Sequence, residues 1–257
     1  MKIAICISGQ LRKLEESLIT TAFKDYDVDY YIHTWAHHLN PNLKNVYKHF
    51  PNAKIEIETY DKFDSLFVDS EFDTDANRYR YAQFYTISKS FNLCKNSNKQ
   101  YNCYIRTRTD VVWPMHLWKK TEEQLSLDLY SVLINSRHIP NKADIVFTTS
   151  EIPTIATAIT GINNELLSLR EWSWGMNKSA FDVLSNIPTD SLVKLAENIK
   201  DINSTTLVDN RIQSPGIWGE IFKRNGICIQ DSSQFRTTLL RYYNDKRKYI
   251  GYYGDIS

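Results

Sequence analysis

The sequence predicts an α/β protein built on a mixed, mainly parallel sheet that is flanked by helices. An apolar run at 3–7 opens the chain and stops at Ser-Gly, which is typical of a buried parallel strand. Residues 11–23 follow with apolar side chains at helical spacing, so a strand, a glycine turn and a helix are expected. Further strand-like runs then alternate with helical ones, and this alternation favours a sheet covered on both faces.

The first half of the chain is expected to add three strands, a loop and a long helix. Residues 78–94 carry apolar and aromatic side chains in a helical pattern. The acidic, irregular residues 61–75 are expected to form a surface loop. The predicted strands lie at 29–35, 54–59 and 101–106, and the alternation at 54–59 indicates the most exposed of them.

The second half of the chain carries shorter patterns. They predict strands at 143–148 and 227–229 and helices at 178–184, 191–200 and 216–224. No internal repeat, low-complexity stretch or Pro/Gly linker divides the sequence, so one domain spanning 1–257 is expected.

Composition excludes several classes of protein. The 31 Lys and Arg residues nearly balance the 30 Asp and Glu residues, which argues against a generally basic nucleic-acid-binding protein. The four cysteines are scattered without a Cys-x-x-Cys pair, so neither a disulfide scaffold nor a zinc knuckle is expected. Aromatic residues make up 13%, with 16 Tyr and 6 Trp, and such rings suit surfaces that bind sugars, nucleobases or lipid headgroups.

Targeting features are weak in this sequence. The N-terminal apolar run is too short for a signal peptide, and no stretch reaches the roughly 20 apolar residues of a spanning helix. We therefore expect a cytoplasmic protein. Residues 241–253 mix basic and aromatic side chains, which favours peripheral contact with anionic membrane headgroups over nucleic-acid binding. A tail that is simply solvated is the alternative.

The residues directly after the first strand, 8–12, form the first candidate site. Ligands of open α/β sheets bind at the carboxyl ends of the strands. Gly9 allows close approach of the backbone, the next helix offers free N–H groups, and Arg12 can pair with a phosphate. The segment Ser-Gly-Gln-Leu-Arg is neither a P-loop nor a Gly-x-Gly-x-x-Gly motif. An ordinary strand-to-helix turn is the alternative.

A second candidate site ends the predicted strand at 101–106. Arg106, Arg108 and Asp110 occupy alternate positions and share one side if the strand continues. Three charges on a central strand are costly to bury unless they pair with one another or hold a ligand. Asp110 can ligate Mg²⁺ or Mn²⁺ on a diphosphate, and the arginines can neutralise the same phosphates. An internal Arg-Asp salt bridge is the alternative.

Four short motifs follow one another along the first part of the chain. They are Ile-Cys-Ile-Ser-Gly-Gln-Leu-Arg at 5–12, Tyr-Tyr-Ile-His-Thr-Trp at 30–35, Gln-Phe-Tyr at 83–85 and Tyr-Ile-Arg-Thr-Arg-Thr-Asp at 104–110. Their order resembles the surface-polysaccharide glycosyltransferases, which are bacterial and viral enzymes of the GT-A type. The resemblance covers mainly 1–115, and weakly 172–175 and 214–220. It implies a single GT-A-like domain in which 1–115 binds a nucleotide-sugar donor and 116–257 receives the acceptor.

The resemblance also implies roles for individual residues in the donor site. Residues expected to contact the nucleotide, its ribose or its phosphates are Ser8, Gly9, Gln10, Arg12, Arg78, Gln83, Arg106 and Arg108. For Arg78 and Gln83 an ordinary helix surface is the alternative. In such enzymes an Asp-x-Asp motif commonly holds Mn²⁺ or Mg²⁺ on the sugar diphosphate. Here Arg108 stands where the first carboxylate would be, which leaves Asp110 as the expected metal or donor-ribose contact.

The second half is expected to supply the catalytic base, while Asp110 acts at the donor. An inverting transfer needs a carboxylate or an imidazole that takes the proton of the acceptor hydroxyl. Glu220 lies in a predicted helix after a Pro-Gly turn and is expected to be this base. Asp209 and Asp182 are the alternatives.

Tryptophans of the second half are expected to line the sugar site. Trp172 and Trp174 lie two residues apart, so on a strand both would face the same side, and Trp218 lies close to Glu220. Packing in the core is the alternative for these rings. Three histidines near the second strand are expected in loops or partner contacts, not as metal ligands: His33, His37 and His38.

The sequence thus predicts a hexosyl- or deoxyhexosyltransferase. It would move a sugar from a nucleotide-sugar donor to a glycan or lipid-linked glycan acceptor, in the synthesis of a surface polysaccharide or a glycoprotein glycan. A metal-independent fucosyl- or sulfo-type transferase that binds its donor phosphates with Arg106 and Arg108 is the first alternative. A glycan- or nucleotide-binding protein without catalytic activity is the second. No nucleic-acid partner is expected.

Overall fold

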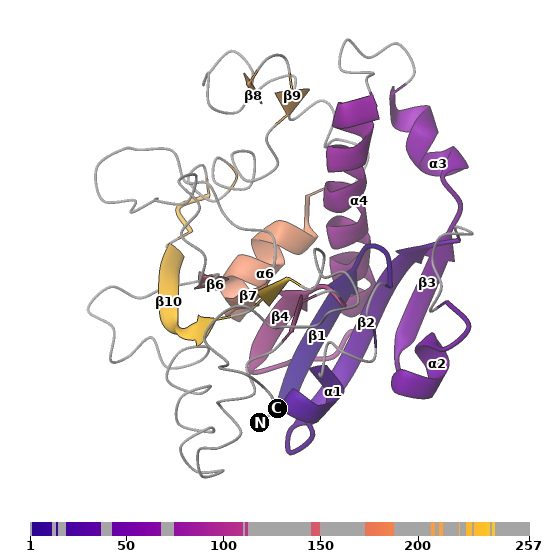
Figure 1. Ribbon diagram of the computed structural model, residues 1–257. Coiled ribbons are helices and arrows are strands. Elements are labelled where there is room, and N and C mark those ends of the chain that lie inside the picture. Colours follow the sequence, from indigo (N-terminus) through magenta and orange to yellow (C-terminus); the bar gives the residue numbers. More distant parts are fainter. Residues whose placement is uncertain are drawn as a thin grey trace, which may run out of the picture.

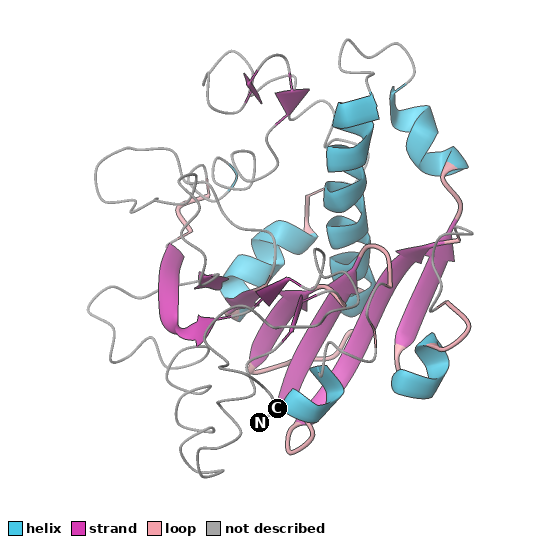
Figure 2. Ribbon diagram, in the orientation of Figure 1, coloured by secondary structure: helices cyan, strands magenta, loops and turns pink. Residues whose placement is uncertain are grey.

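The computed structural model of the chain describes residues 2–11, 14, 19–36, 43–67, 75–109, 111–112, 145–149, 173–187, 207–208, 211–212, 221, 225–227, 229–236 and 238–239. The strands in these residues are β1 (Lys2–Ser8), β2 (Asp27–Trp35), β3 (Lys54–Glu58), β4 (Cys103–Thr107), β5 (Val111–Val112), β6 (Ile145–Thr149), β7 (Trp174–Met176), β8 (Leu207–Val208), β9 (Arg211–Ile212), β10 (Ile229–Arg236) and β11 (Thr238–Leu239). The helices are α1 (Ile19–Ala22), α2 (Val46–His49), α3 (Asp61–Asp64), the 3-10 turn η1 (Ser65–Phe67), α4 (Asp75–Lys95) and α6 (Lys178–Ser185). They surround one main sheet (Figures 1 and 2).

Strand β1 lies inside a seven-stranded sheet with the order β10-β6-β7-β4-β1-β2-β3. β7 runs antiparallel to both of its neighbours, whereas the other pairs in this sheet are parallel. Two small antiparallel sheets pair β5 with β11 and β8 with β9. The predicted mixed, mainly parallel sheet is therefore confirmed.

Helices cover both faces of the main sheet. α4, with 21 residues, lies on one face together with α6, while α1 and α2 lie on the opposite face (Figure 1). None of the helices in the described part of the chain combines the length and the apolar character needed to cross a lipid bilayer.

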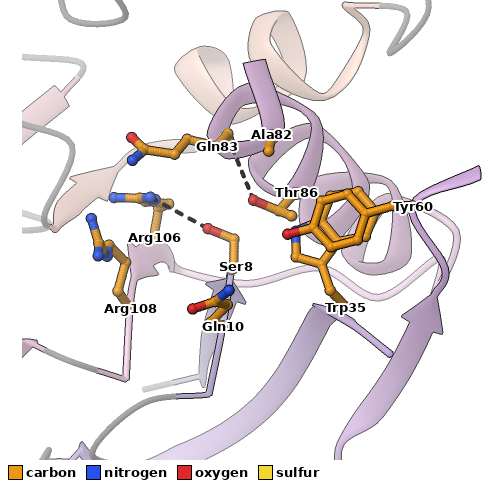
Figure 3. A pocket seen from close by; sticks show the side chains of 10 residues that line it. Ser8, Gln10, Trp35, Tyr60, Ala82, Gln83, Thr86, Arg106 and Arg108 are labelled. Atoms are coloured by element: carbon orange, nitrogen blue, oxygen red, sulfur yellow. Dashed lines mark hydrogen bonds between the residues drawn. The ribbon is translucent and has the colours of Figure 1, made fainter. Parts of the chain in front are cut away.

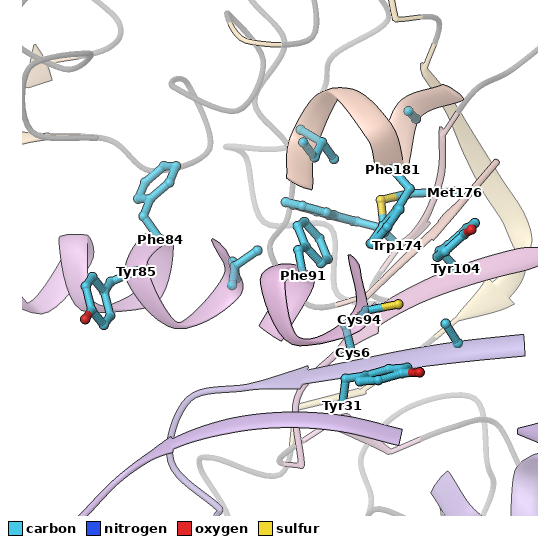
Figure 4. Packing of buried hydrophobic residues seen from close by; sticks show 14 of the residues in the cluster. Cys6, Tyr31, Phe84, Tyr85, Phe91, Cys94, Tyr104, Trp174, Met176 and Phe181 are labelled. Carbon is cyan, nitrogen blue, oxygen red and sulfur yellow. The ribbon is translucent and has the colours of Figure 1, made fainter. Parts of the chain in front are cut away.

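Alternate residues of β1 enter two separate apolar clusters, because successive side chains of a strand point to opposite faces. Ala4 and Cys6 pack in the cluster under α4 and α6, part of which Figure 4 shows. Ile3, Ile5 and Ile7 pack in the cluster on the α1 and α2 face. All five side chains are at most 1% exposed. Burial on both faces explains why the first strand is a continuous apolar run instead of an alternating one.

Most predicted elements in the described residues are confirmed. The runs at 3–7, 29–35, 54–59, 101–106 and 143–148 correspond to β1, β2, β3, β4 and β6, and the helical patterns at 78–94 and 178–184 to α4 and α6. The strand predicted at 227–229 begins later, as β10. Of the helix predicted at 11–23, the structure describes α1 at its C-terminal end. Most of the helices predicted at 191–200 and 216–224, and the tail 241–253, lie outside the described residues.

The acidic segment 61–75 was expected to be an irregular loop, and this expectation is wrong where the structure describes it. α3 and η1 occupy its first residues, and α4 begins at Asp75. Phe63 is the reason, because its ring is 2% exposed and lies 5.7 Å from the ring of Trp35. One buried aromatic anchor therefore holds a helical turn within an acidic sequence.

Candidate functional site

The order of the strands predicts a ligand site between the ends of β1 and β4. From β1 the chain proceeds outwards to β2 and β3 and then returns to the other side of β1 as β4. Ligands of open α/β sheets bind outside the carboxyl ends of the strands at such a reversal of strand order, since the two connections leave in opposite directions. Ser8 ends β1, and Arg106 lies one residue before the end of β4. The two predicted donor segments therefore meet at the reversal.

A pocket opens at this position, with an empty volume of about 500 Å³ that includes its mouth. Figure 3 shows two unlike sides: Arg106 and Arg108 lie on one, and Trp35 and Tyr60 on the other. The lining comes from the ends of β1, β2 and β4, from the residue before α3 and from α4, and consists of Ser8, Gly9, Gln10, Trp35, Tyr60, Ala82, Gln83, Thr86, Arg106 and Arg108. A charged side and an aromatic side suit a ligand with an anionic part and a ring.

Arg106 is the most deeply buried charged group of the pocket, with 2% of its surface exposed. Its Nη2 lies 3.4 Å from the hydroxyl oxygen of Ser8, to which it donates. Its guanidinium carbon lies 5.4 Å from the ring centroid of Trp174. The Ser173 hydroxyl donates to the carbonyl oxygen of Arg106 at 3.1 Å. Because a guanidinium stays charged at physiological pH, this side of the pocket attracts anions.

The loop after β1 is held by two hydrogen bonds to its backbone. Gly9 has φ +99°, a conformation that residues with a Cβ rarely adopt. Its N–H donates to the carbonyl oxygen of His33 at 3.2 Å. The Thr109 hydroxyl donates to the carbonyl oxygen of Gln10 at 3.2 Å. The loop is thereby tied to β2 and to the end of β4.

The aromatic side of the pocket is a stack of rings. Tyr60 lies parallel to Trp35 with centroids 4.5 Å apart, and Tyr85 of α4 lies nearly parallel to the same indole at 5.4 Å. Phe63 meets Trp35 at a steep angle. Several ring contacts from α3, α4 and the segment between β3 and α3 thus fix the indole that borders the pocket.

Behind this stack, Glu58 accepts three hydrogen bonds. The donors are His33 Nε2 at 3.0 Å, Tyr85 Oη at 2.9 Å and Lys89 Nζ at 2.9 Å. The bond from His33, joined by those from Lys89 and Tyr85, holds the pKa of Glu58 well below its usual value even though burial opposes this. Burial and the bond to Glu58 raise the pKa of Tyr85 to about 12. The group is therefore an ionised carboxylate matched by a lysine ammonium.

His33 was expected in a loop or a partner contact, and this expectation is wrong. It lies inside β2 with 0% of its surface exposed. With Glu56 and Glu58 it brings three ligand atoms within 4.8 Å of one another. Lys89 Nζ lies 3.3 Å from Glu56 Oε1 and 2.9 Å from Glu58 Oε1, so a lysine already supplies the positive charge of this cluster.

The structure brings together most of the donor-site residues that it describes. Those that line one pocket are Ser8, Gly9, Gln10, Gln83, Arg106 and Arg108. Arg78 lies in α4, but its side chain is outside the described residues. The other predicted site residues outside the described part are Arg12, Asp110, Trp172, Trp218 and Glu220.

Trp174 takes the packing role that was the alternative for it. Its ring has 0% exposed surface, so it is not available to stack on a sugar. Four lining residues were not predicted for the site: Trp35, Tyr60, Ala82 and Thr86. Trp35 closes a predicted strand at its carboxyl end, and that position was a usable signal. Tyr60 and Thr86 carry no comparable signal, since only the tertiary fold brings them to the pocket.

The described lining does not by itself make a divalent-cation site. Mg²⁺ and Mn²⁺ prefer oxygen ligands, above all carboxylates. The charged groups of the described lining are two guanidinium groups. Asp110, the predicted ligand, directly follows Thr109 but lies outside the described residues.

Comparisons with known proteins found similarity only to solved structures. No protein-family model matches the sequence, and neither does any curated protein. The chain is similar to the galactosyltransferase LgtC in complex with donor and acceptor sugar analogues, at 12% identity and a TM-score of 0.47, over 89% of this chain and 73% of that one. Mouse xyloside xylosyltransferase 1 is similar at 11% identity and a TM-score of 0.42, over 90% and 84%. A nucleoside-diphosphate-sugar pyrophosphorylase from Vibrio cholerae is similar at 8% identity and a TM-score of 0.41, over 89% and 90%.

Proposed function

We propose that this protein is a glycosyltransferase that moves a sugar from a nucleotide-sugar donor to a glycan acceptor. The observation that carries the proposal is the pocket at the reversal of strand order, with Arg106 and Arg108 on one side. Two guanidinium groups match a diphosphate in charge and in hydrogen-bonding geometry. The order of the sequence motifs supports the same activity, because it resembles GT-A-type glycosyltransferases, and in this proposal the first 115 residues bind the donor.

The arginines would act on the bond that breaks. When the sugar leaves, negative charge grows on the phosphate oxygen that had held it, while the sugar passes through an oxocarbenium-like state. Cations that are fixed before the reaction stabilise that growing charge without having to rearrange. Arg106 meets this requirement, because burial and its contacts to Ser8 and Trp174 hold its position.

The acceptor and the base belong to residues 116–257 in this proposal. Glu220 takes the proton of the acceptor hydroxyl, and Trp172 and Trp218 contact the acceptor sugar. Asp110 contacts the donor and binds Mn²⁺ or Mg²⁺ there. We further propose a cytoplasmic location, a hexosyl or deoxyhexosyl donor, and a surface-polysaccharide or glycoprotein glycan as product, with the basic aromatic tail at a membrane that carries a lipid-linked acceptor.

A thermal-shift screen of UDP-, GDP-, CMP- and dTDP-sugars, with and without Mn²⁺, tests the donor class. A ligand that binds only the folded protein raises the melting temperature by mass action. We expect stabilisation by one nucleotide class, followed by turnover of that sugar with an oligosaccharide acceptor. No response to any donor would contradict the proposal. Stabilisation without turnover would favour the binding-protein alternative.

The variant Asp110→Ala tests the role of the metal. We expect it to fold and to lose turnover together with any response to Mn²⁺. Asp25→Ala is the control, because the Asp25 side chain is exposed and pairs at 4.0 Å with the similarly exposed Lys24. Full activity of Asp110→Ala without metal would instead favour the metal-independent transferase that uses Arg106 and Arg108.

A further inference from the structure

Arg106 of β4 and Trp174 of β7 are direct cross-strand partners. The guanidinium carbon lies over the indole, 5.4 Å from the ring centroid. Only 2% of Arg106 and 0% of Trp174 is exposed, so little water screens this contact. β1 pairs with the opposite edge of β4, and the hydroxyl oxygen of its last residue, Ser8, lies 3.4 Å from Arg106 Nη2. Three adjacent strands therefore position one guanidinium at the wall of the pocket.

We propose that Trp174 is a positioning residue whose indole face holds the Arg106 guanidinium toward the pocket and thereby sets the affinity for a phosphate-bearing ligand. The inference rests on the proposed function only in requiring that the pocket take such a ligand. Trp174 is fully buried and acts through Arg106, not by touching the ligand.

An aromatic ring suits this role better than a carboxylate does. A carboxylate also stabilises a buried guanidinium, but its negative charge cancels the attraction that a phosphate would feel. The face of an indole attracts a cation through the quadrupole of the ring and carries no net charge, so the positive charge of Arg106 is not offset by this contact. This attraction is strongest at desolvated sites and with tryptophan, which are the conditions found at Trp174.

The ring of Trp174 is itself held in place. It belongs to the cluster of buried side chains that includes Phe91, Met176 and Phe181 (Figure 4). Its strand pairs with β4 on one side and with β6 on the other. Because a closely packed interior leaves a large ring little room to turn, the face under Arg106 is in position before a ligand arrives.

Calorimetric titration with inorganic diphosphate measures the predicted effect. Trp174→Leu removes the aromatic face, and we expect binding about 10-fold weaker. Trp174→Phe keeps a smaller face, and we expect a loss of about 3-fold. Where these variants fail to fold, fluorinated tryptophans at position 174 keep the shape of the ring while they weaken its quadrupole. Diphosphate affinity is then expected to fall with each added fluorine.

Phe181→Leu is the matched control. Phe181 lies in the same cluster and stacks on Tyr104 at 4.0 Å. We expect this variant to melt at a lower temperature with diphosphate affinity unchanged, whereas a merely structural role of Trp174 would give both positions the same behaviour. Unchanged affinity across the fluorinated series, or no diphosphate binding by the wild-type protein, would overturn the inference. Diphosphate binding that depends on Trp174, without turnover of any nucleotide sugar, would refute the transferase proposal and leave this inference standing.

Discussion

The imidazole Nε2 of His33 lies 3.0 Å from a carboxylate oxygen of Glu58, and both side chains are buried where β2 and β3 end. Lys89 of α4 binds the other carboxylate oxygen at 2.9 Å. The carbonyl oxygen of His33 accepts from Gly9, and Tyr85, which donates to Glu58, stacks on Trp35. This network therefore joins the glycine loop and the aromatic side of the pocket to two strands and a helix.

Replacing Glu58 by Gln is expected to lower the free energy of unfolding by about 3 kcal/mol at neutral pH. The variant leaves the Lys89 ammonium partly buried and without its main counter-charge, which is the costly way to break a buried ion pair. Urea unfolding measures the change. The matched control is Glu56→Gln, because the Glu56 side chain is 34% exposed and lies 3.3 Å from the same lysine. A loss below about 1 kcal/mol is expected there, and equal losses would argue against the central role of Glu58.

The same network predicts how stability depends on acid. The pKa of Glu58 in the folded protein lies well below its usual 4.5, so its contribution is complete above pH 4.5 and is lost as the pH falls below that value. The wild-type protein is thus expected to lose stability more steeply than Glu58→Gln between about pH 5 and pH 3. Unfolding free energies measured in urea at several pH values test this. Parallel curves for the two proteins would show that the network does not titrate in this way.

Local pattern was enough to predict the strands that carry the arginine side of the pocket. The apolar run before Ser8 and the strand that ends near Arg106 are both visible in the sequence, and adjacent parallel strands end at one edge. The segment containing Glu58 was correctly predicted as a strand that is more exposed than β1, β2 and β4. Burial of Glu58 itself depends on partners that lie 25, 27 and 31 residues away in the chain. No local pattern encodes such a meeting.

Aromatic residues were the hardest to assign from sequence. A tryptophan beside a glycine in the second half fits a sugar platform and a core position equally well. The burial of Trp174 decides between them, since its ring has 0% exposed surface, and the register of β7 against β4 places it opposite Arg106. Phe63 shows the same limit. Its acidic neighbours in the sequence indicated a surface loop, whereas its ring packs on Trp35.

Gly9→Ala is expected to cost about 2 kcal/mol of stability and to weaken donor binding. The added methyl group meets no atom within 4 Å, so the cost comes from φ +99° alone. Relief of that strain would shift Ser8 and Gln10 in the pocket. Gly226→Ala, at φ +64°, is the control, and we expect a loss of about 1 kcal/mol with donor binding unchanged. Chemical unfolding together with a nucleotide titration separates the two effects, and wild-type donor affinity in Gly9→Ala would contradict the role of the loop.

Replacing Arg106 by Gln is expected to weaken the binding of UDP or another donor diphosphate at least about 10-fold. Arg106 is 2% exposed, so salt screens its charge little. Arg108, which is half-buried, is more open to screening, and Arg108→Gln is expected to cost about 3-fold at low salt and less at high salt. Calorimetric titrations of both variants at two salt concentrations measure these differences. A larger loss for Arg108→Gln, or an Arg106→Gln effect that vanishes in salt, would mean that the anion binds at the mouth of the pocket, away from the end of β4.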